Sequence, residues 1–430
     1  MTVAPGRAIP VAPWVVRSRT HFRVLDSHRV VHHIYFSPGM FGFTRLGSYD
    51  YFSHVERALE ARFRQAGLDI ETHLSDALPT ASVRRRAARL AELIAGTSTG
   101  DGPIHLLGHS TGGLDVRLVA SPSAQLTSAE TKGWLPRLRS VTTMNTPHYG
   151  TPLASFFATA KGQQVLYALS AFTVVGLSLG KRPLAVASLL MGIIGRGDRG
   201  LGITLPILGR SVDSMLGLVD DALSPDLRTY LKAIKEDQGA MLQLTPEAMD
   251  LFVAGFEDRP GVWYQSTASM APAPTARKWM RTIGHPWNAL SLALFSTLHD
   301  ISSRHDPRYS CALMPADPAG RATADVDRTE AMLSKVFGES PDLHANDGCV
   351  PIRSQLWGTL VWAGLGDHLD VLGHYRDETV EERVELRHHD WLTSGSRFND
   401  ASFAALMDAV AHGMVESARS SARSSARGAR

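Results

Sequence analysis

The residues best suited to chemistry lie around Ser110, in the stretch GHSTGG at residues 108–113. An apolar run at 103–107 precedes it, and residues 114–120 follow with a helical pattern, which together predict a strand, a tight turn and a helix. The flanking glycines permit the close packing that a strained turn requires. At a helix start, backbone N–H groups can stabilise a developing oxyanion. Ser110 is therefore the candidate nucleophile, the alternative being an ordinary glycine-rich turn.

A second glycine-containing loop lies upstream, where residues 30–36 (VVHHIYF) predict a strand and residues 37–42 (SPGMFG) a loop. In an acyl-transfer site such a loop supplies one oxyanion N–H, and the residue after the nucleophile supplies the other. These donors would be the backbone N–H groups of Met40 and Thr111. The alternative is a loop with no such role.

An acid and a histidine follow in the chain order that a serine nucleophile requires. Asp347 lies in an Asn-Asp-Gly turn, which can place a carboxylate past a strand end, and His368 follows it. His368 is the expected base, oriented by Asp347. Since the chain has 18 histidines, other candidates remain: His374 is the nearest rival, followed by His388 and His389.

Taken together, these motifs resemble the bacterial true lipases of the α/β-hydrolase fold, of the kind secreted by Pseudomonas and Burkholderia. The resemblance rests on the loop at 37–42, the GHSTGG turn, NTPHYGTPLA, NDGCVP and DHLD, and more weakly on GAMLQLTP. It spans about residues 30 to 375. It implies hydrolysis of carboxylic esters through an acyl-enzyme, with Ser110 attacking, His368 as base and then acid, and Asp347 orienting His368.

The resemblance implies no redox or nucleotide cofactor, but it does suggest a structural calcium ion. Relatives hold this ion partly through the aspartate of the His-Leu-Asp motif, which is Asp370 here. A second carboxylate is then needed upstream of the acid, and three candidates lie in that region: Asp325, Asp327 and Glu330. The alternative for Asp370 is a carboxylate at a helix start or on the surface.

Three features depart from the family pattern. Relatives usually have His-Gly in the upstream loop, whereas this chain has Pro38-Gly39. Residues 1–16 contain three prolines and no continuous apolar core, so no secretory signal is expected and the expected location is cytoplasmic. Cys311 and Cys349 could form a bridge or remain two buried thiols.

Composition is that of an ordinary soluble globular chain of 430 residues, 44% hydrophobic and 20% charged. The net charge of +2 includes four arginines in the Ser/Ala/Arg stretch at 417–430, so the remainder is not basic and nucleic acid is not an expected partner. That stretch predicts a disordered tail.

The organisation we predict is one α/β-hydrolase domain at 29–416, with an N-terminal extension at 1–28. Helical cap or lid insertions are expected at about 156–235 and about 270–340. Further strands are predicted at 140–144, 261–266 and 358–363, and helices at 84–95, 287–301 and 398–416. The arginines of the helix at 84–95 are expected to form a solvated face.

The first insertion is long and apolar. Its two most apolar pieces, residues 165–180 and 184–194, are shorter than the ~20 residues of a membrane-spanning helix. They predict either helices packed over the core or a cap that moves at a lipid surface and whose apolar inner face favours long acyl chains. We prefer the second.

The sequence thus predicts a mostly parallel sheet flanked by helices and, by resemblance, a triacylglycerol lipase or long-chain carboxylesterase acting on lipid or ester substrates. Three alternatives are an intracellular polyhydroxyalkanoate depolymerase, an acyltransferase and a non-catalytic binding protein on the same fold.

Overall fold

The computed structural model describes residues 30–40, 45–46, 49–76, 78–126, 133–159, 162–163, 166, 232–234, 236–281, 286–304, 306, 308–309, 311, 326–375 and 392–428. At its centre is a six-stranded sheet in the order β4-β1-β5-β6-β7-β8, with every neighbouring pair parallel. The strands are β1 (Val31–Ser37), β4 (Asp69–Leu74), β5 (Ile104–His109), β6 (Leu138–Met144), β7 (Trp263–Met270) and β8 (Thr359–Leu365).

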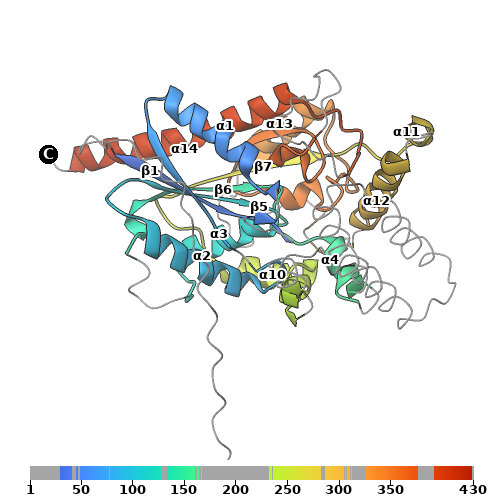
Figure 1. Ribbon diagram of the computed structural model, residues 1–430, viewed down its shortest axis with the longest axis horizontal. Helices are drawn as coiled ribbons and strands as arrows, with labels where there is room; N and C mark the ends of the chain where they lie inside the picture. Colours follow the sequence, from blue (N-terminus) through green and yellow to red (C-terminus); the bar gives the residue numbers. More distant parts are fainter. Residues whose placement is uncertain are drawn as a thin grey trace, which may run out of the picture.

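Helices cover both faces of this sheet (Figure 1). On one face lie α1 (Ser53–Gln65) and α14 (Asp400–Gly428), and on the other α2 (Val83–Thr97) and α3 (Thr111–Ala120). An apolar core fills the space between the sheet and each pair of helices. Because helices cover both faces of the sheet, both faces of an inner strand are buried, and every residue of β5 is buried.

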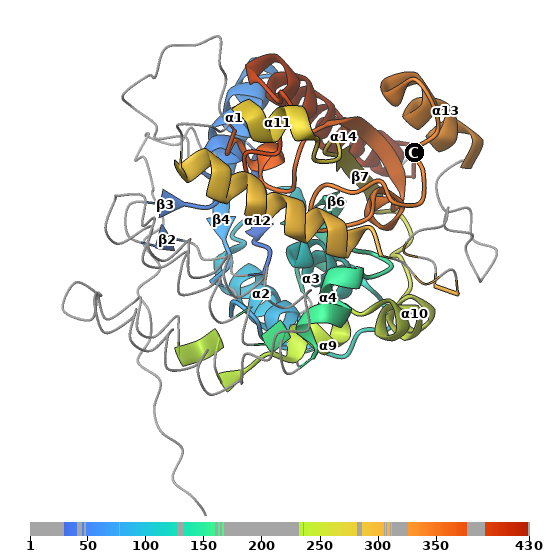
Figure 2. The same ribbon diagram turned by 90° about the vertical axis from the view of Figure 1, so that its right-hand side faces the viewer.

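Further helices gather at the end of the sheet where the strands terminate, with α12 crossing in front of the strands in Figure 2. They are α4 (Pro152–Phe157), α9 (Gly239–Gln243), α10 (Pro246–Gly255), α11 (Ala276–Arg281) and α12 (Pro286–Ser302). The helix α13 (Val326–Phe337) packs instead against β8, where Leu333 shares an apolar cluster with Leu360 and Ala363. Two short strands, β2 (Arg45–Leu46) and β3 (Tyr49–Asp50), form a separate antiparallel pair, and three 3₁₀ turns occupy Leu135–Arg137, Ile352–Gln355 and Asp370–Leu372.

The sequence expectation of a parallel α/β sheet flanked by helices is confirmed. The strands expected at 30–36, 103–107, 140–144, 261–266 and 358–363 are β1, β5, β6, β7 and β8. The helices expected at 84–95, 287–301 and 398–416 are α2, α12 and the first part of α14. The sequence interpretation missed β4 and α1, and β4 is a half-buried edge strand whose residues DIETHL give little apolar signal.

Two expectations are wrong. The helix α14 continues to Gly428, through most of the stretch expected to be a disordered tail. Alanine and arginine are strong helix formers, and here they extend a helix whose first half is already docked on the sheet. The arginines of α2 are not all solvated either, because Arg86 is buried.

The extension at 1–28 and most of the insertion at 156–235 lie outside the described residues, so these boundaries remain predictions. None of the helices in the described ranges combines the length and the apolarity needed to cross a membrane.

Candidate active site

Ser110 occupies the turn between β5 and α3, with φ 54° and ψ −129°. Positive φ is uncommon for a residue with a side chain, and the surrounding structure must enforce it. The Ser110 N–H donates to the Met144 carbonyl at the end of β6, at 2.9 Å. The expected strained strand-turn-helix elbow is thus present at Ser110.

Glycines are required around Ser110 because the backbone of neighbouring segments leaves no room for a Cβ. A Cβ at Gly108 would lie 2.1 Å from the carbonyl oxygen of Gly112. A Cβ at Gly112 would lie 2.0 Å from the carbonyl oxygen of Ser37, at the end of β1. Because both obstacles are backbone atoms, the elbow can pack against β1 only with glycine at these positions.

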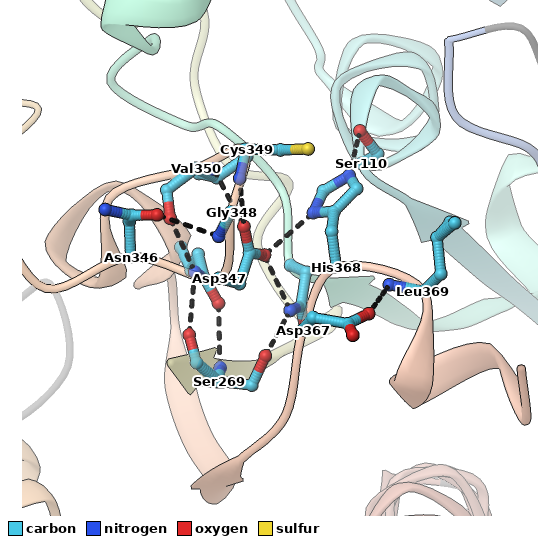
Figure 3. A network of polar contacts seen from close by, with 12 residues as sticks. Ser110, Ser269, Asn346, Asp347, Gly348, Cys349, Val350, Asp367, His368 and Leu369 are labelled. Carbon is cyan, nitrogen blue, oxygen red and sulfur yellow. Dashed lines mark hydrogen bonds and ion pairs between the residues drawn. The ribbon is translucent and has the colours of Figure 1, made fainter. Parts of the chain in front are cut away.

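A hydrogen-bonded relay joins the three residues that the sequence placed in order (Figure 3). His368 Nε2 lies 2.9 Å from Ser110 Oγ, and His368 Nδ1 lies 2.7 Å from Asp347 Oδ2. With Nδ1–H donating to the carboxylate, Nε2 accepts from the serine hydroxyl, which is the arrangement a general base needs. Ser110 and His368 are 9% and 8% exposed, whereas Asp347 is fully buried.

The Asp347 carboxylate is held by four donors. Its Oδ1 accepts from the N–H groups of Cys349 and Val350, at 2.9 and 2.8 Å, within its own turn. Its Oδ2 accepts from Asn145 Nδ2, at 2.8 Å, and from His368. The His368 N–H also donates to the Asp347 carbonyl at 2.9 Å, so backbone and side chain together fix the pair.

Asp347 lies far from β7 in sequence but beside its end in space. The Ala271 N–H, just after β7, donates to the Asn346 carbonyl at 2.9 Å. Asn145, which follows β6 with φ 49°, also donates to Ser269 Oγ of β7 at 2.6 Å. The carboxylate thus stands at the carboxyl end of the sheet, with Ser110.

The expected oxyanion donors flank Ser110. A Cβ at Gly39 would lie 2.8 Å from Ser110 Cβ, so the loop that carries Met40 packs directly on the nucleophile. Met40 is half-buried, and Thr111 is the buried first residue of α3. A backbone N–H in the first helical turn has no intrahelical acceptor, so the Thr111 N–H remains available to a substrate oxygen.

A chain of polar contacts that the sequence interpretation missed ties this loop to the histidine. The Gly39 N–H donates to Tyr51 Oη at 3.1 Å, and Tyr51 Oη lies 2.7 Å from His109 Nδ1. His109 Nε2 lies 2.9 Å from the His368 carbonyl, so Nε2 carries the proton and Nδ1 accepts from the tyrosine. Burial lowers the pKa of His109 well below its ordinary value, and the nearby His368 adds to this, which keeps the ring neutral.

A buried ion pair, also missed, anchors the other side of the same loop. Arg86 of α2 pairs with Asp115 of α3 at 2.8 Å and donates to the Pro38 carbonyl. Ser37 Oγ donates to Asp115 Oδ2 at 2.7 Å. Burial raises the pKa of Asp115, partly opposed by Arg86. The helical pattern of α2 and the Gly-Gly-Leu-Asp sequence of α3 gave no signal of this long-range contact.

Two buried aspartates shape the turn that carries His368. Asp370 Oδ2 accepts from the Asp367 N–H at 2.8 Å and from Ser396 Oγ at 2.6 Å, and Asp367 Oδ2 accepts from Ser394 Oγ at 2.7 Å. These bonds connect the turn to the segment before α14. Asp370 therefore holds the His368 turn in place.

The calcium expectation remains a prediction. In the described part of the chain, Asp370 belongs to no group of three or more His, Cys, Asp or Glu side chains close enough to share an ion. Of the second carboxylates considered, Asp325 lies outside the described residues, Asp327 is exposed on α13 and Glu330 pairs with Arg353. These contacts do not supply the six to eight oxygens that calcium takes.

The rival histidines are not brought to Ser110 by the described contacts. His374 is buried against His54, and its Nε2 lies 3.4 Å from the Tyr51 carbonyl oxygen. His388 and His389 lie outside the described residues. Cys311 and Cys349 are both free thiols, and of the two only Cys311 is buried, because Cys349 is partly exposed. Burial raises the pKa of Cys311 to about 12 and that of Cys349 well above its ordinary value.

An apolar cluster lies beside the relay. It includes Leu153 and Phe157 of α4 and Leu292 and Phe295 of α12. Met40, Cys349 and Leu369 pack against it. Met40 is an expected oxyanion donor, Leu369 follows His368, and Cys349 lies two residues after Asp347. The cluster thus packs α4 and α12 against the loops that carry the site.

Comparisons with solved structures return bacterial ester-cleaving enzymes at low identity. The Staphylococcus hyicus lipase is 16% identical, with a TM-score of 0.46, over 90% of this chain and 96% of that one. EstA from Clostridium botulinum is 17% identical, with a TM-score of 0.43, over 87% of each chain. Lipase 1 from Pelosinus fermentans is 15% identical, with a TM-score of 0.44, over 88% of this chain and 98% of that one. No family model matches the chain, and no curated protein sequence matches it. These values assign the chain to no family.

Proposed function

We propose that this protein is a serine hydrolase that cleaves carboxylic esters through an acyl-enzyme. The observation that carries the proposal is the relay Ser110 Oγ, His368 Nε2, His368 Nδ1 and Asp347 Oδ2, with links of 2.9 and 2.7 Å, on a strained elbow at the carboxyl end of β5. Strain and a buried polar relay at one place are costly to maintain, and they are typical of catalytic sites.

The proposed reaction has two halves. Ser110 Oγ attacks the ester carbonyl carbon while its proton passes to His368 Nε2, and the Met40 and Thr111 N–H groups bind the oxyanion. Collapse of the tetrahedral intermediate transfers that proton to the departing alcohol and leaves an acyl group on Ser110. Water then attacks the acyl carbon while His368 Nε2 takes one of its protons. Collapse of this second intermediate releases the acid, and His368 returns the proton to Ser110 Oγ.

The proposed substrate is an ester with a long acyl chain, as in a triacylglycerol lipase or long-chain carboxylesterase. Its support is the apolar cluster around α4 and α12, against which Met40 and Leu369 pack. An acyl chain that packs against the partly buried members of this cluster would gain about 0.8 kcal/mol for each CH₂ it buries, so a longer chain would bind more tightly.

Hydrolysis of p-nitrophenyl esters from acetate to palmitate, by the wild type and by Ser110→Ala, tests the proposal. We expect kcat/KM to rise with chain length and to fall by at least about 10⁴-fold in the variant. Ser123→Ala, at an exposed serine, is the matched control and should keep full activity. Activity on short chains alone would indicate an esterase instead, and near-normal turnover by Ser110→Ala would refute the proposal.

A further inference from the structure

Three side chains that can ligate a metal lie together on the sheet, away from the proposed active site. His33 belongs to β1, and Glu71 and His73 belong to the neighbouring edge strand β4. In the parallel register His33 is opposite Glu71, and Tyr35 is opposite His73, so these side chains share one face. His33 is near the start of β1, whereas Ser110 stands at the carboxyl end of the sheet.

The donor atoms of these residues converge. His33 Nδ1 lies 3.2 Å from His73 Nε2 and 3.6 Å from Glu71 Oε2, and His73 Nε2 lies 4.0 Å from Glu71 Oε1. Two nitrogens bound to one tetrahedral Zn²⁺ at about 2.0–2.1 Å lie about 3.3 Å apart. The nitrogen separation thus already matches that of a zinc site.

Outer contacts orient both imidazoles for this role. His33 Nε2 lies 3.0 Å from the Thr99 carbonyl, so Nε2 carries the proton and the Nδ1 lone pair faces the cluster. The His73 ring stacks on Tyr35, with centroids 4.4 Å apart and 11° between planes. Tyr35 Oη is in turn 3.0 Å from Thr97 Oγ1 at the end of α2.

Burial and charge also suit a cation. His33 and His73 are 2% and 7% exposed, whereas the Glu71 side chain is 36% exposed, which leaves an approach for an ion and for a water ligand. The Glu71 carboxylate supplies a negative charge beside the two buried rings.

We propose that His33 Nδ1, His73 Nε2 and a Glu71 carboxylate oxygen bind one Zn²⁺ ion. Two imidazole nitrogens and a carboxylate form a common zinc donor set, and a water would complete the tetrahedron. The ion would cross-link the edge strand β4 to β1. The proposal does not depend on the ester chemistry.

The described ranges contain a second group of potential metal ligands, and the test must distinguish the two groups. Asp347, Cys349 and His368 also lie close enough to share an ion, but they belong to the proposed active site. A zinc measurement must therefore report which group binds.

The test is a titration of the full chain, freed of any affinity tag and stripped of metal, with ZnCl₂ against a chromophoric chelator. We expect one Zn²⁺ per chain with a Kd below about 1 µM, and at least about 100-fold weaker binding in Glu71→Gln and in His73→Gln. Two exposed controls, Glu92→Gln and His412→Gln, should bind as the wild type does.

Two further readouts keep the test decisive. His368→Ala should retain the tight site, and Zn²⁺ should raise the Tm of the wild type but not that of Glu71→Gln, whose fold is checked by circular dichroism. The proposal fails if the wild type binds no Zn²⁺ at micromolar concentration. It fails also if binding survives in Glu71→Gln and His73→Gln, or is lost in His368→Ala.

Discussion

His368 owes its position to contacts from three directions: the Ser110 hydroxyl, the Asp347 carboxylate and the ring of His109, whose centroid lies 4.7 Å away. Each contact fixes a different degree of freedom of the imidazole. Because the imidazole is already oriented, little of the activation free energy is needed to bring it into position.

Replacement of His368 should therefore be far more damaging than replacement of its nearest rival. We expect His368→Ala to lower kcat for p-nitrophenyl esters by about 10⁴-fold or more, because no other group takes the serine proton. His374→Ala removes a buried ring that contacts Tyr51 and His54, and should lower mainly the Tm. The reverse pattern of kcat values would transfer the role of base to His374.

Tyr51→Phe tests the contact chain between the Met40 loop and His368. Loss of the hydroxyl leaves the Gly39 N–H and His109 Nδ1 without this partner, which should cost about 1–3 kcal/mol of stability. We expect kcat to fall about tenfold with little change in KM, because the loop and the base lose their common support.

Tyr35→Phe is the matched control, since Tyr35 is also buried and its hydroxyl bonds to Thr97, at the end of α2. It should lower the Tm comparably and leave kcat unchanged. Equal effects of both variants on kcat would show that the Tyr51 contact chain has no special role.

Among individual residues, the sequence predicted those of the relay and missed those that support it. Ser110, Asp347 and His368 stand in short motifs whose order has chemical meaning. Tyr51, Arg86 and Asp115 have no such local pattern, and only the fold brings Arg86 to the Pro38 carbonyl.

Among the elements, the junction of β1, β5 and α3 sets the geometry of the nucleophile. Gly112→Ala would place a methyl group 2.0 Å from the Ser37 carbonyl oxygen. Because backbone on both sides must move, we expect a loss of at least about 3 kcal/mol in stability and a large loss of activity. Thermal unfolding and ester hydrolysis measure both.

Gly96→Ala, in α2, is the control, because a Cβ there meets no atom within 4 Å. It should leave activity intact and stabilise the protein by about 0.5–1 kcal/mol through helix propensity. A fully active and stable Gly112→Ala would contradict the packing seen at the elbow.

The elements themselves were predictable to different degrees. The inner strands β1 and β5 are buried on both faces and are rich in apolar residues. The edge strand β4 carries Asp69, Glu71 and His73, so its sequence resembles a loop. The end of α14 was misread because a low-complexity composition hides the helix propensity of Ala and Arg.

For the whole molecule, buried histidines predict how stability depends on pH. Burial lowers the pKa of His105, His109 and His148 well below the ordinary value of 6.5. The unfolded chain therefore binds protons as the pH falls below about 6.5 while the folded chain does not, which favours unfolding. We expect the Tm to fall steadily from pH 7.5 to pH 5.5, and a Tm independent of pH in this range would show that these rings are not buried neutral.

How the expected cap packs on the core is the feature of the molecule that the sequence predicts least well. The expected cap at 156–235 falls mostly outside the described residues, and the Asp347 turn reaches its place only because a long insertion after β7 returns to the strand's end. Short motifs fix the chemistry that such a chain can perform, whereas insertions without periodic pattern leave substrate choice open.

The most direct test of the central claim is a covalent trap of the nucleophile. Intact-protein mass spectrometry after reaction with a p-nitrophenyl alkylphosphonate should show one phosphonyl group per chain, located on Ser110 by peptide mapping. Labelling should be absent in Ser110→Ala and much slower in His368→Ala, because the hydroxyl is activated by that imidazole. Hydrolysis of esters without labelling of Ser110, or labelling of another residue, would contradict the account.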